Sequence, residues 1–310
     1  DLESDIQTMG LSIPLSKNLD ILRQPLYIGD KRIENRLAIH PMEGCDGLPD
    51  GKPGKLTFRR YERFAAGGAG LLWLEAAAVQ YDGRANPRQL FICKDNKCEL
   101  QKLLETIYGA AKNKNGMNFK PYTVIQLTHS GRYSNKPAPI IADSNPYLDK
   151  FLPDQYSVIT DDELERLEDS YVEAAAIARD IGFDAVDIKS CHRYLISELL
   201  SSYTREGKYG GSFENRTRFL LNVIDKIKDR LGTSIDIAVR LNVYDAIPYP
   251  YGWGVDKQDF QKVDIKEPIK LIKLLYARGV KLVNITMGNP YYNPHVGRPY
   301  NMGPYIPPEH

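Results

Sequence analysis

The chain has 310 residues, of which 42% are hydrophobic and 26% are charged. These proportions are typical of a globular protein with a sizeable core, and the length suits one barrel or two average domains. The formal net charge is only +1, from 41 basic and 40 acidic residues. That balance gives no electrostatic reason to expect nucleic acid or an anionic membrane as a partner. We therefore expect a small-molecule substrate and no nucleic-acid or membrane partner. A homo-oligomer is compatible with the sequence.

The cysteine content argues against disulfides and metal. The four cysteines are Cys45, Cys93, Cys98 and Cys191, too few and too scattered for a disulfide scaffold. Cys93 and Cys98 lack the second pair that a zinc site needs, so we expect free thiols and no metal. No apolar run reaches the ~20 residues that span a bilayer, and residues 1–20 lack a signal-peptide pattern. The sequence therefore predicts a cytoplasmic protein.

Short β-branched or apolar runs alternate with longer amphipathic stretches along the chain. The expected strands cover residues 37–40, 70–74, 122–127, 185–188, 235–239 and 281–285. The expected helices cover residues 58–66, 100–111, 163–179, 213–230 and 268–278. Thr160 and Glu163 form a capping-box signature at the start of the third helix. A long polar loop separates the third strand from this helix, and its length suggests a functional role.

Strict alternation of β and α segments predicts a parallel sheet with helical crossovers. The pattern alone does not distinguish a closed barrel from an open doubly wound sheet. However, the first strand is followed by the sequence HPMEG at residues 40–44, where a Rossmann domain would carry its glycine-rich fingerprint. In a barrel, catalytic groups gather at the C-terminal ends of the strands. Polar residues cluster at those ends here.

One segment resembles a known family signature. Residues 205–219 read REGKYGGSFENRTRF, which is similar to the segment after strand four in the Old Yellow Enzyme family. Further matches follow in the family's order: Pro41-Met42, residues 67–70, Gly83-Arg84, residues 126–132 (QLTHSGR) and Arg240. The resemblance covers about residues 25 to 300.

The resemblance implies a TIM (β/α)₈-type barrel that binds FMN. It implies one barrel domain over residues 1–310, with an N-terminal arm over residues 1–24. Only six of the family's eight strands can be found in the sequence. Because the last two strands hold the FMN phosphate in the family, we expect the barrel to be incomplete at its C-terminus.

The resemblance also implies which residues contact the flavin. Backbone contacts near flavin N5 and O4 would come from Pro41, Met42 and Ala76. Gln126 offers a donor and an acceptor to the pyrimidine edge. The Arg240 guanidinium would lie where reduced FMN carries negative charge, so it should raise the reduction potential.

The segment KSCHRY at residues 189–194 would face the substrate. His192 matches a family position that donates a hydrogen bond to the substrate's carbonyl oxygen, and Lys189 stands where relatives usually carry another histidine. Lysine can still donate to an oxyanion, although as a flexible point charge. Tyr194 matches the family's proton donor, and a phenol is protonated at neutral pH, as such a donor must be.

Two charged residues depart from the family pattern. Glu43 occupies the cofactor-contacting position near flavin O4, where relatives carry threonine, serine or cysteine, and Lys189 replaces a histidine. Because some relatives bind FMN covalently through that cysteine, Glu43 predicts a noncovalent flavin. An unpaired charge is costly where water is excluded, so we predict that Lys189 and Glu43 form an ion pair. Two independently solvated charges are the alternative.

The sequence thus predicts an FMN-dependent oxidoreductase of the ene-reductase type. It would use NAD(P)H to reduce the activated C=C bond of an α,β-unsaturated carbonyl compound. One alternative is an oxidative amine demethylase-like flavin dehydrogenase of the same superfamily. Another is a flavin-binding protein without turnover, which Lys189, Glu43 and the missing strands would favour.

Overall fold

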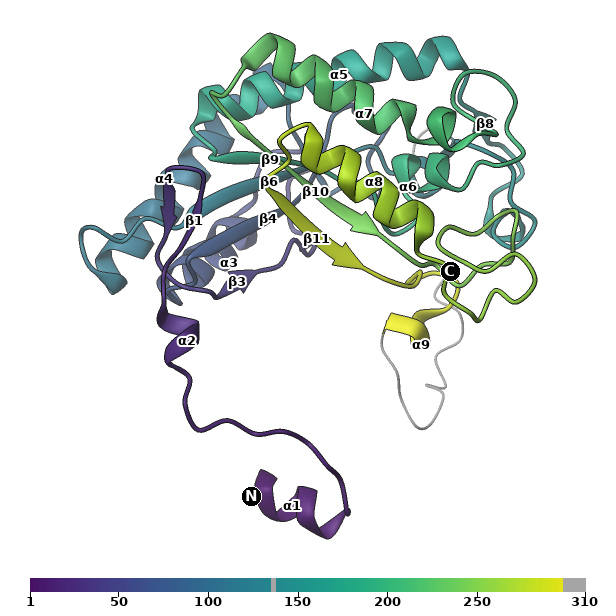
Figure 1. The fold of residues 1–310 in the computed structure, drawn as a ribbon. Helices are drawn as coiled ribbons and strands as arrows, with labels where there is room; N and C mark the ends of the chain where they lie inside the picture. The colour runs from purple at the N-terminus through teal and green to yellow at the C-terminus, as the bar shows by residue number, and fades with distance from the viewer. Residues whose placement is uncertain (135–137, 298–310) are drawn as a thin grey trace.

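A computed structural model describes residues 1–134 and 138–297. Within this part of the chain, one curled parallel sheet has six strands in a row, in the order of the sequence (Figure 1), and a short seventh strand, β5 (Leu90–Phe91), pairs with the end of the second. The strands are β3 (Ala38–Ile39), β4 (Leu71–Ala78), β6 (Tyr122–Thr128), β9 (Ala185–Ile188), β10 (Asp236–Asn242) and β11 (Leu282–Thr286). The six strands predicted from sequence are all present.

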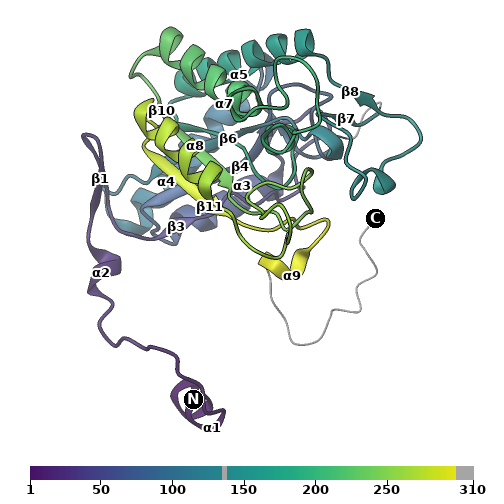
Figure 2. The ribbon, with the colours of Figure 1, turned by 45° about the vertical axis from the view of Figure 1, so that its right-hand side comes forward.

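Helices between these strands cover the outer face of the sheet (Figures 1 and 2). They are α3 (Lys55–Ala66), α4 (Lys97–Asn115), α5 (Asp161–Ile181), α7 (Phe213–Leu231) and α8 (Lys266–Ala277). Each predicted helix is present, and its ends differ from the predicted ones by at most four residues. The capping box at the start of α5 is confirmed, because Thr160 Oγ1 accepts from Glu163 N and the Glu163 carboxylate accepts from Thr160 N.

Several short elements were not predicted, because they are too short for a periodic pattern. The hairpin of β1 (Leu26–Ile28) and β2 (Lys31–Ile33) turns at Gly29, whose φ of 58° suits glycine. The other short elements after this hairpin are β5 (Leu90–Phe91), β7 (Ile140–Ile141), β8 (Ser157–Val158), α6 (Leu195–Leu200), α9 (Pro294–Gly297) and the 3-10 turns η1 (Lys94–Asn96), η2 (Gly131–Tyr133) and η3 (Asp149–Phe151).

The four inner strands, β4, β6, β9 and β10, bury side chains on both faces. Along β4, Leu72 and Leu74 join the large core under the helices, whereas Trp73 faces the inside of the curled sheet. A smaller inner core forms where the β1–β2 hairpin packs Ile28 and Ile33 against Trp73. Side chains alternate between the two faces along a strand. The polar residues toward the C-terminal ends of the strands therefore share the inner face with this core and point into one common space.

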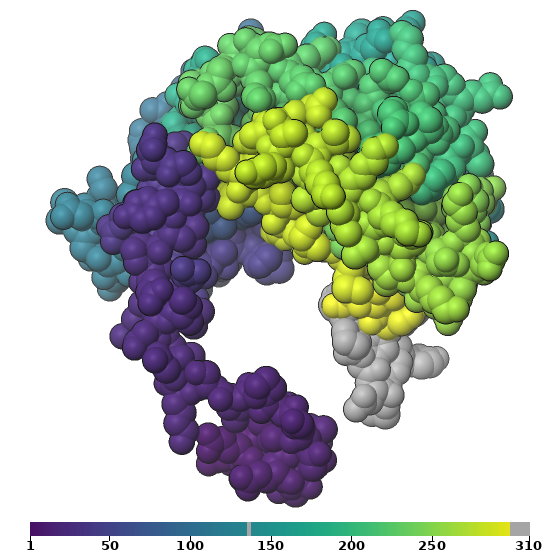
Figure 3. Space-filling view, in the orientation of Figure 1, coloured from purple at the N-terminus to yellow at the C-terminus, as the bar shows by residue number. Residues whose placement is uncertain are grey.

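The curled sheet is open between its edge strands in the described residues. β3 and β11 are not paired with each other, although the side chains of His40 and Asn284 approach to 3.3 Å across the gap. The result is a half-barrel of the predicted type. Residues 1–25, which include α1 (Leu2–Thr8) and α2 (Asp20–Arg23), bury no side chain fully and lead away from the half-barrel (Figure 3). Over residues 1–134 and 138–297, every helix is too short or too polar to cross a membrane.

Candidate active site

The C-terminal ends of the parallel strands meet at one end of the half-barrel, which we call the mouth. It is formed by residues 41–43 after β3, Ala76 in β4, Gln126 in β6, residues 187–194 of β9 and its loop, and Arg240 in β10. All nine residues predicted to contact cofactor or substrate fall in these segments. The parallel topology brings them together, because they lie at or just after the C-terminal ends of five parallel strands.

A buried carboxylate organises the floor of the mouth. Asp187 is fully buried and accepts from Gln126 Nε2 at 2.6 Å, from Trp73 Nε1 at 2.8 Å and from Arg240 N at 2.6 Å. Burial raises the pKa of Asp187 to about 6, and these hydrogen bonds and the Arg240 charge oppose that rise. Because the Gln126 amide nitrogen faces Asp187, its carbonyl oxygen is directed the other way.

Arg240 lies beside this carboxylate with donor capacity to spare. Its Nη1 donates to Pro41 O at 2.9 Å, which ties β10 to the segment after β3. Its Nε is buried and has no hydrogen-bond partner among the described residues. A buried guanidinium nitrogen without an acceptor is uncommon, so the position suits a ligand that brings an acceptor atom. Pro41 and Ala76 are buried nearby, whereas the Met42 side chain is 66% exposed.

An irregularity in β4 fixes the segment that carries Glu43. The register of β4 against β6 shifts between Leu74 and Ala76, and the intervening Glu75 is 1% exposed. Glu75 accepts from Gly44 N at 3.0 Å and pairs with Arg60 at 2.5 Å. Gly44 is therefore anchored to β4, and this anchor holds the adjacent Glu43 over the mouth.

Glu43, Lys189 and Tyr194 form a hydrogen-bonded group that we call the Glu43 cluster. Lys189 Nζ lies 3.1 Å from Glu43 Oε1, and the Tyr194 hydroxyl donates to the same oxygen at 3.2 Å. The ammonium also lies 3.7 Å from the centroid of the Tyr194 ring, a cation–π contact. Burial, and then the Glu43 charge, raise the pKa of Tyr194 well above its usual range, so its hydroxyl stays protonated. The predicted ion pair between Lys189 and Glu43 is confirmed.

The loop between β9 and α6 presents His192 in an unusual backbone conformation. His192 and Arg193 have φ values of 61° and 59°, a region that non-glycine residues seldom adopt. Arg193 is held by Asp245, with 3.1 Å between Nη1 and Oδ2 in a fully buried pair. Burial, and then the charges of Lys189 and Arg240, lower the pKa of His192 to about 3. Its imidazole is therefore neutral at physiological pH and retains one N–H to donate.

Two further tyrosines lie against Tyr194. The rings of Tyr133, in the loop after β6, and Tyr291, in the loop after β11, stack with centroids 3.9 Å apart. Tyr133 lies 5.8 Å from the Tyr194 ring, and the Tyr291 hydroxyl is 3.5 Å from the Tyr194 hydroxyl. Sequence reasoning missed both, because isolated tyrosines in loops carry no local pattern. It also missed Asp187, although an acidic residue inside an apolar strand was a usable signal.

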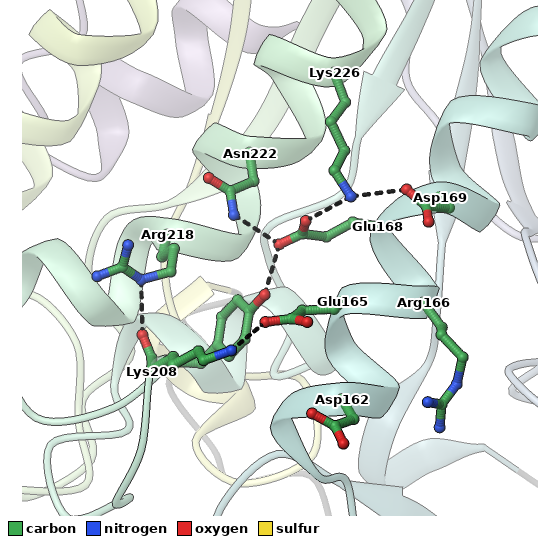
Figure 4. Close-up of a pocket in the computed structure, with 10 residues that line it drawn as sticks. Asp162, Glu165, Arg166, Glu168, Asp169, Lys208, Arg218, Asn222 and Lys226 are labelled. Atoms are coloured by element: carbon green, nitrogen blue, oxygen red, sulfur yellow. Dashed lines mark hydrogen bonds and ion pairs between the residues drawn. The ribbon is translucent and has the colours of Figure 1, made fainter.

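A second hollow, of about 630 Å³, lies on the outer layer between α5 and α7 (Figure 4). Its charged side chains largely neutralise one another. Lys226 pairs with Glu168 at 3.0 Å, and Lys208 pairs with Glu165 at 2.6 Å. Glu168 is also satisfied by the Tyr209 hydroxyl at 2.9 Å. Because this hollow is lined by residues of α5, α7 and the loop before α7, none of them in a strand, and its buried carboxylate is paired, the mouth is the better candidate for the active site.

Comparison with known proteins agrees with this geometry. A family model described as the NADH:flavin oxidoreductase / NADH oxidase family matches residues 22–280. An NADPH dehydrogenase of Halalkalibacterium halodurans is 32% identical over 263 residues, which cover 83% of this chain and 70% of that protein. An NADH:flavin oxidoreductase of Gibberella zeae is 30% identical over 286 residues, which cover 85% of this chain and 66% of that protein.

The fold has matches among solved structures. Old Yellow Enzyme from Pichia sp. AKU4542 matches with a TM-score of 0.71 and 22% identity, over 88% of this chain and 72% of that one. The predicted barrel-type fold is therefore confirmed. The chain spans about two thirds of the length of the curated relatives described above. The family match also confirms the predicted class, an FMN oxidoreductase with NAD(P)H as reductant. By its match over residues 22–280, the chain belongs to the NADH:flavin oxidoreductase / NADH oxidase family.

Proposed function

We propose that this chain forms the catalytic half-barrel of an ene-reductase, which reduces the activated C=C bond of an α,β-unsaturated carbonyl compound at the expense of NAD(P)H. The observation that carries the proposal is the position of the protonated Tyr194 hydroxyl. The Lys189 ammonium lies in the same mouth, 3.7 Å from the centroid of the Tyr194 ring. So does Arg240 Nε, which has no hydrogen-bond partner in the described part of the chain. A proton donor, a cation for a polarised oxygen and an unpaired donor for a cofactor thus share one space.

The residues of the mouth fit FMN. A flavin presents acceptor oxygens and a ring N–H at its pyrimidine edge, and Arg240 Nε and the Gln126 amide carbonyl supply the matching donor and acceptor. Pro41, Met42 and Ala76 would approach the ring through their backbone. When bound, FMN supplies the hydride chemistry, accepting from NAD(P)H and donating to the alkene.

The chain's own residues would handle the oxygen and the proton. Lys189 and the neutral His192 would donate hydrogen bonds to the substrate's carbonyl oxygen, where negative charge develops as hydride reaches the β-carbon. Tyr194 would then give its proton to the α-carbon. Glu43 would pair with Lys189 and hold its side chain in place at the edge of the flavin site.

Replacing Tyr194 tests this assignment. Tyr194→Phe should slow reoxidation of the reduced, FMN-loaded protein by 2-cyclohexenone by about 10²–10⁴-fold, the usual worth of general acid catalysis. Reduction of the flavin by NADPH should be nearly unchanged. Tyr171→Phe is a matched control, because Tyr171 is fully buried in α5 and its hydroxyl has no partner within the described part of the chain. Equal losses in both half-reactions of Tyr194→Phe would contradict the role of proton donor.

An anaerobic titration separates the proposal from its alternatives. Bleaching of the flavin by NADH or NADPH, followed by recovery of its absorbance with an enone, supports the ene-reductase. Bleaching by a secondary or tertiary amine instead would support the demethylase-like dehydrogenase, and no bleaching by either would support a flavin-binding protein without turnover. A cytoplasmic location is also part of the proposal, because all four cysteines are free, as expected in a reducing compartment.

A further inference from the structure

The Glu43 cluster contains one member in contact with solvent. The side chains of Lys189 and Tyr194 are both 3% exposed, whereas that of Glu43 is 18% exposed. Glu43 Oε1 also accepts the Tyr194 hydroxyl directly. The buried phenol is therefore connected to solvent through a carboxylate that already holds its proton in a hydrogen bond.

We infer that Glu43 returns a proton from solvent to Tyr194 after each turnover. This rests on the proposed function, in which Tyr194 loses its proton to the substrate. In that step the phenol O–H bond breaks, a C–H bond forms at the α-carbon, and a phenolate remains at Tyr194. Glu43 then takes a proton from water and passes it to the phenolate, which restores the phenol and the carboxylate. One solvent proton is consumed for each alkene reduced.

The alternative donors are less well placed. Lys189 faces the Tyr194 ring, 3.7 Å from its centroid, and donates its hydrogen bond to Glu43 rather than to the phenol oxygen. It is positioned to stabilise a phenolate electrostatically. The Tyr291 hydroxyl is 3.5 Å from that of Tyr194, at the limit of a hydrogen bond. A phenol that protonated Tyr194 would itself become a phenolate, whereas a carboxylic acid is stronger than a phenol by about 6 pKa units.

Glu43→Gln should separate the first turnover from those that follow. Its amide keeps the size and can still accept a hydrogen bond, but it cannot relay a proton as a carboxylic acid does. Because Glu43 also orients Lys189, single-turnover oxidation of the reduced FMN-loaded protein by 2-cyclohexenone should slow somewhat in this variant. Steady-state kcat with NADPH should fall further, by about tenfold or more beyond that loss. A larger loss in the later turnovers than in the first is not expected of a merely structural defect.

Chemical rescue and a contact measurement complete the test. Formate should restore part of the lost kcat in Glu43→Ala, because it can enter the space and act as the missing acid. In the protein without FMN, the ¹³Cζ resonance of Tyr194, assigned with Tyr194→Phe, should move in Glu43→Gln as the hydroxyl loses its carboxylate acceptor. An unmoved resonance, or equal losses in both rates without rescue, would overturn the inference.

Two further outcomes identify what failed. If the contrast between first and later turnovers appears in Tyr291→Phe and not in Glu43→Gln, Tyr291 is the return route and the inference about Glu43 is overturned. If the enone does not reoxidise the reduced wild-type protein at all, the proposed function fails and the inference fails with it. The first result leaves the ene-reductase assignment intact, so the two failures are distinguishable.

Discussion

Asp187→Asn tests how the buried carboxylate of the mouth contributes to stability. The asparagine can keep its carbonyl oxygen toward Gln126 and Trp73 but then turns an amide nitrogen toward the Arg240 N–H, 2.6 Å from Oδ1 in the wild type. Losing that acceptor costs about 1–3 kcal/mol. The same change removes a fully buried ionisable group, and the consequence of that removal depends on pH.

The pKa of Asp187 is raised to about 6 in the folded protein, against about 3.9 in an unfolded chain. Below pH ~4 both states are protonated, so burial carries no charge penalty. Between pH ~4 and ~6 the unfolded chain ionises first, and wild-type stability falls by about 3 kcal/mol, since each pKa unit is worth about 1.4 kcal/mol. Asparagine does not ionise. The variant should therefore be less stable than the wild type at pH 4 and close to it at pH 7.

Urea unfolding of both proteins at several pH values from 4 to 7 measures this difference. Other titrating groups are common to the two proteins and cancel in the difference of their unfolding free energies. Asp229→Asn, on the exposed end of α7, is a control for the change of charge alone. A variant-minus-wild-type difference that stays constant to within about 0.5 kcal/mol across this range would refute the argument.

Two other predictions concern the flavin and the backbone. Acid precipitation of the FMN-loaded protein should release the flavin into the supernatant, because Glu43 stands where a cysteinyl link would form; a yellow pellet would contradict this. Gly254→Ala should lower the free energy of unfolding in urea by at least about 2 kcal/mol, because Gly254 has φ +72° and a Cβ there would lie 1.9 Å from Val243 O. Gly109→Ala in α4 is the matched control, because the added Cβ would have no atom within 4 Å apart from the neighbouring backbone of its own helix. It should stabilise the protein by about 1 kcal/mol, and equal effects of the two substitutions would refute the reasoning.

The fold could be predicted from sequence because its four inner strands, β4, β6, β9 and β10, are buried on both faces. Runs such as residues 71–74 are apolar without interruption, and the helices between the strands show one apolar stripe, so both kinds of element produce a clear pattern. The β1–β2 hairpin gave no such pattern, since three residues per strand cannot establish a period. The bulge at Glu75 was equally hidden, because its cause is the long-range contact with Arg60 and Gly44.

The candidate site was predictable in its members more than in its contacts. The Lys189–Glu43 pair followed from sequence, because two opposite charges at the same end of one sheet have a strong reason to meet. The hydrogen bond from Tyr194 to Glu43 did not, because it depends on the positive φ values at His192 and Arg193, which aim the loop. Asp187 was seen as part of a strand, but its three donors come from β4, β6 and β10, and only the assembled sheet shows them together.

The contacts of the mouth join parts of the chain that are far apart in sequence. Tyr194 and Glu43 are separated by 151 positions, and Arg240 and Pro41 by 199. Closing such long loops costs entropy before any contact repays it, so contacts of this kind form late in folding. Neighbouring strands and helices can pair as soon as each has been synthesised. The contact between Pro41, after β3, and Arg240, in β10, can form only once β10 has been synthesised. We therefore expect the helices and most of the sheet to form first, and the contacts of the mouth to form last.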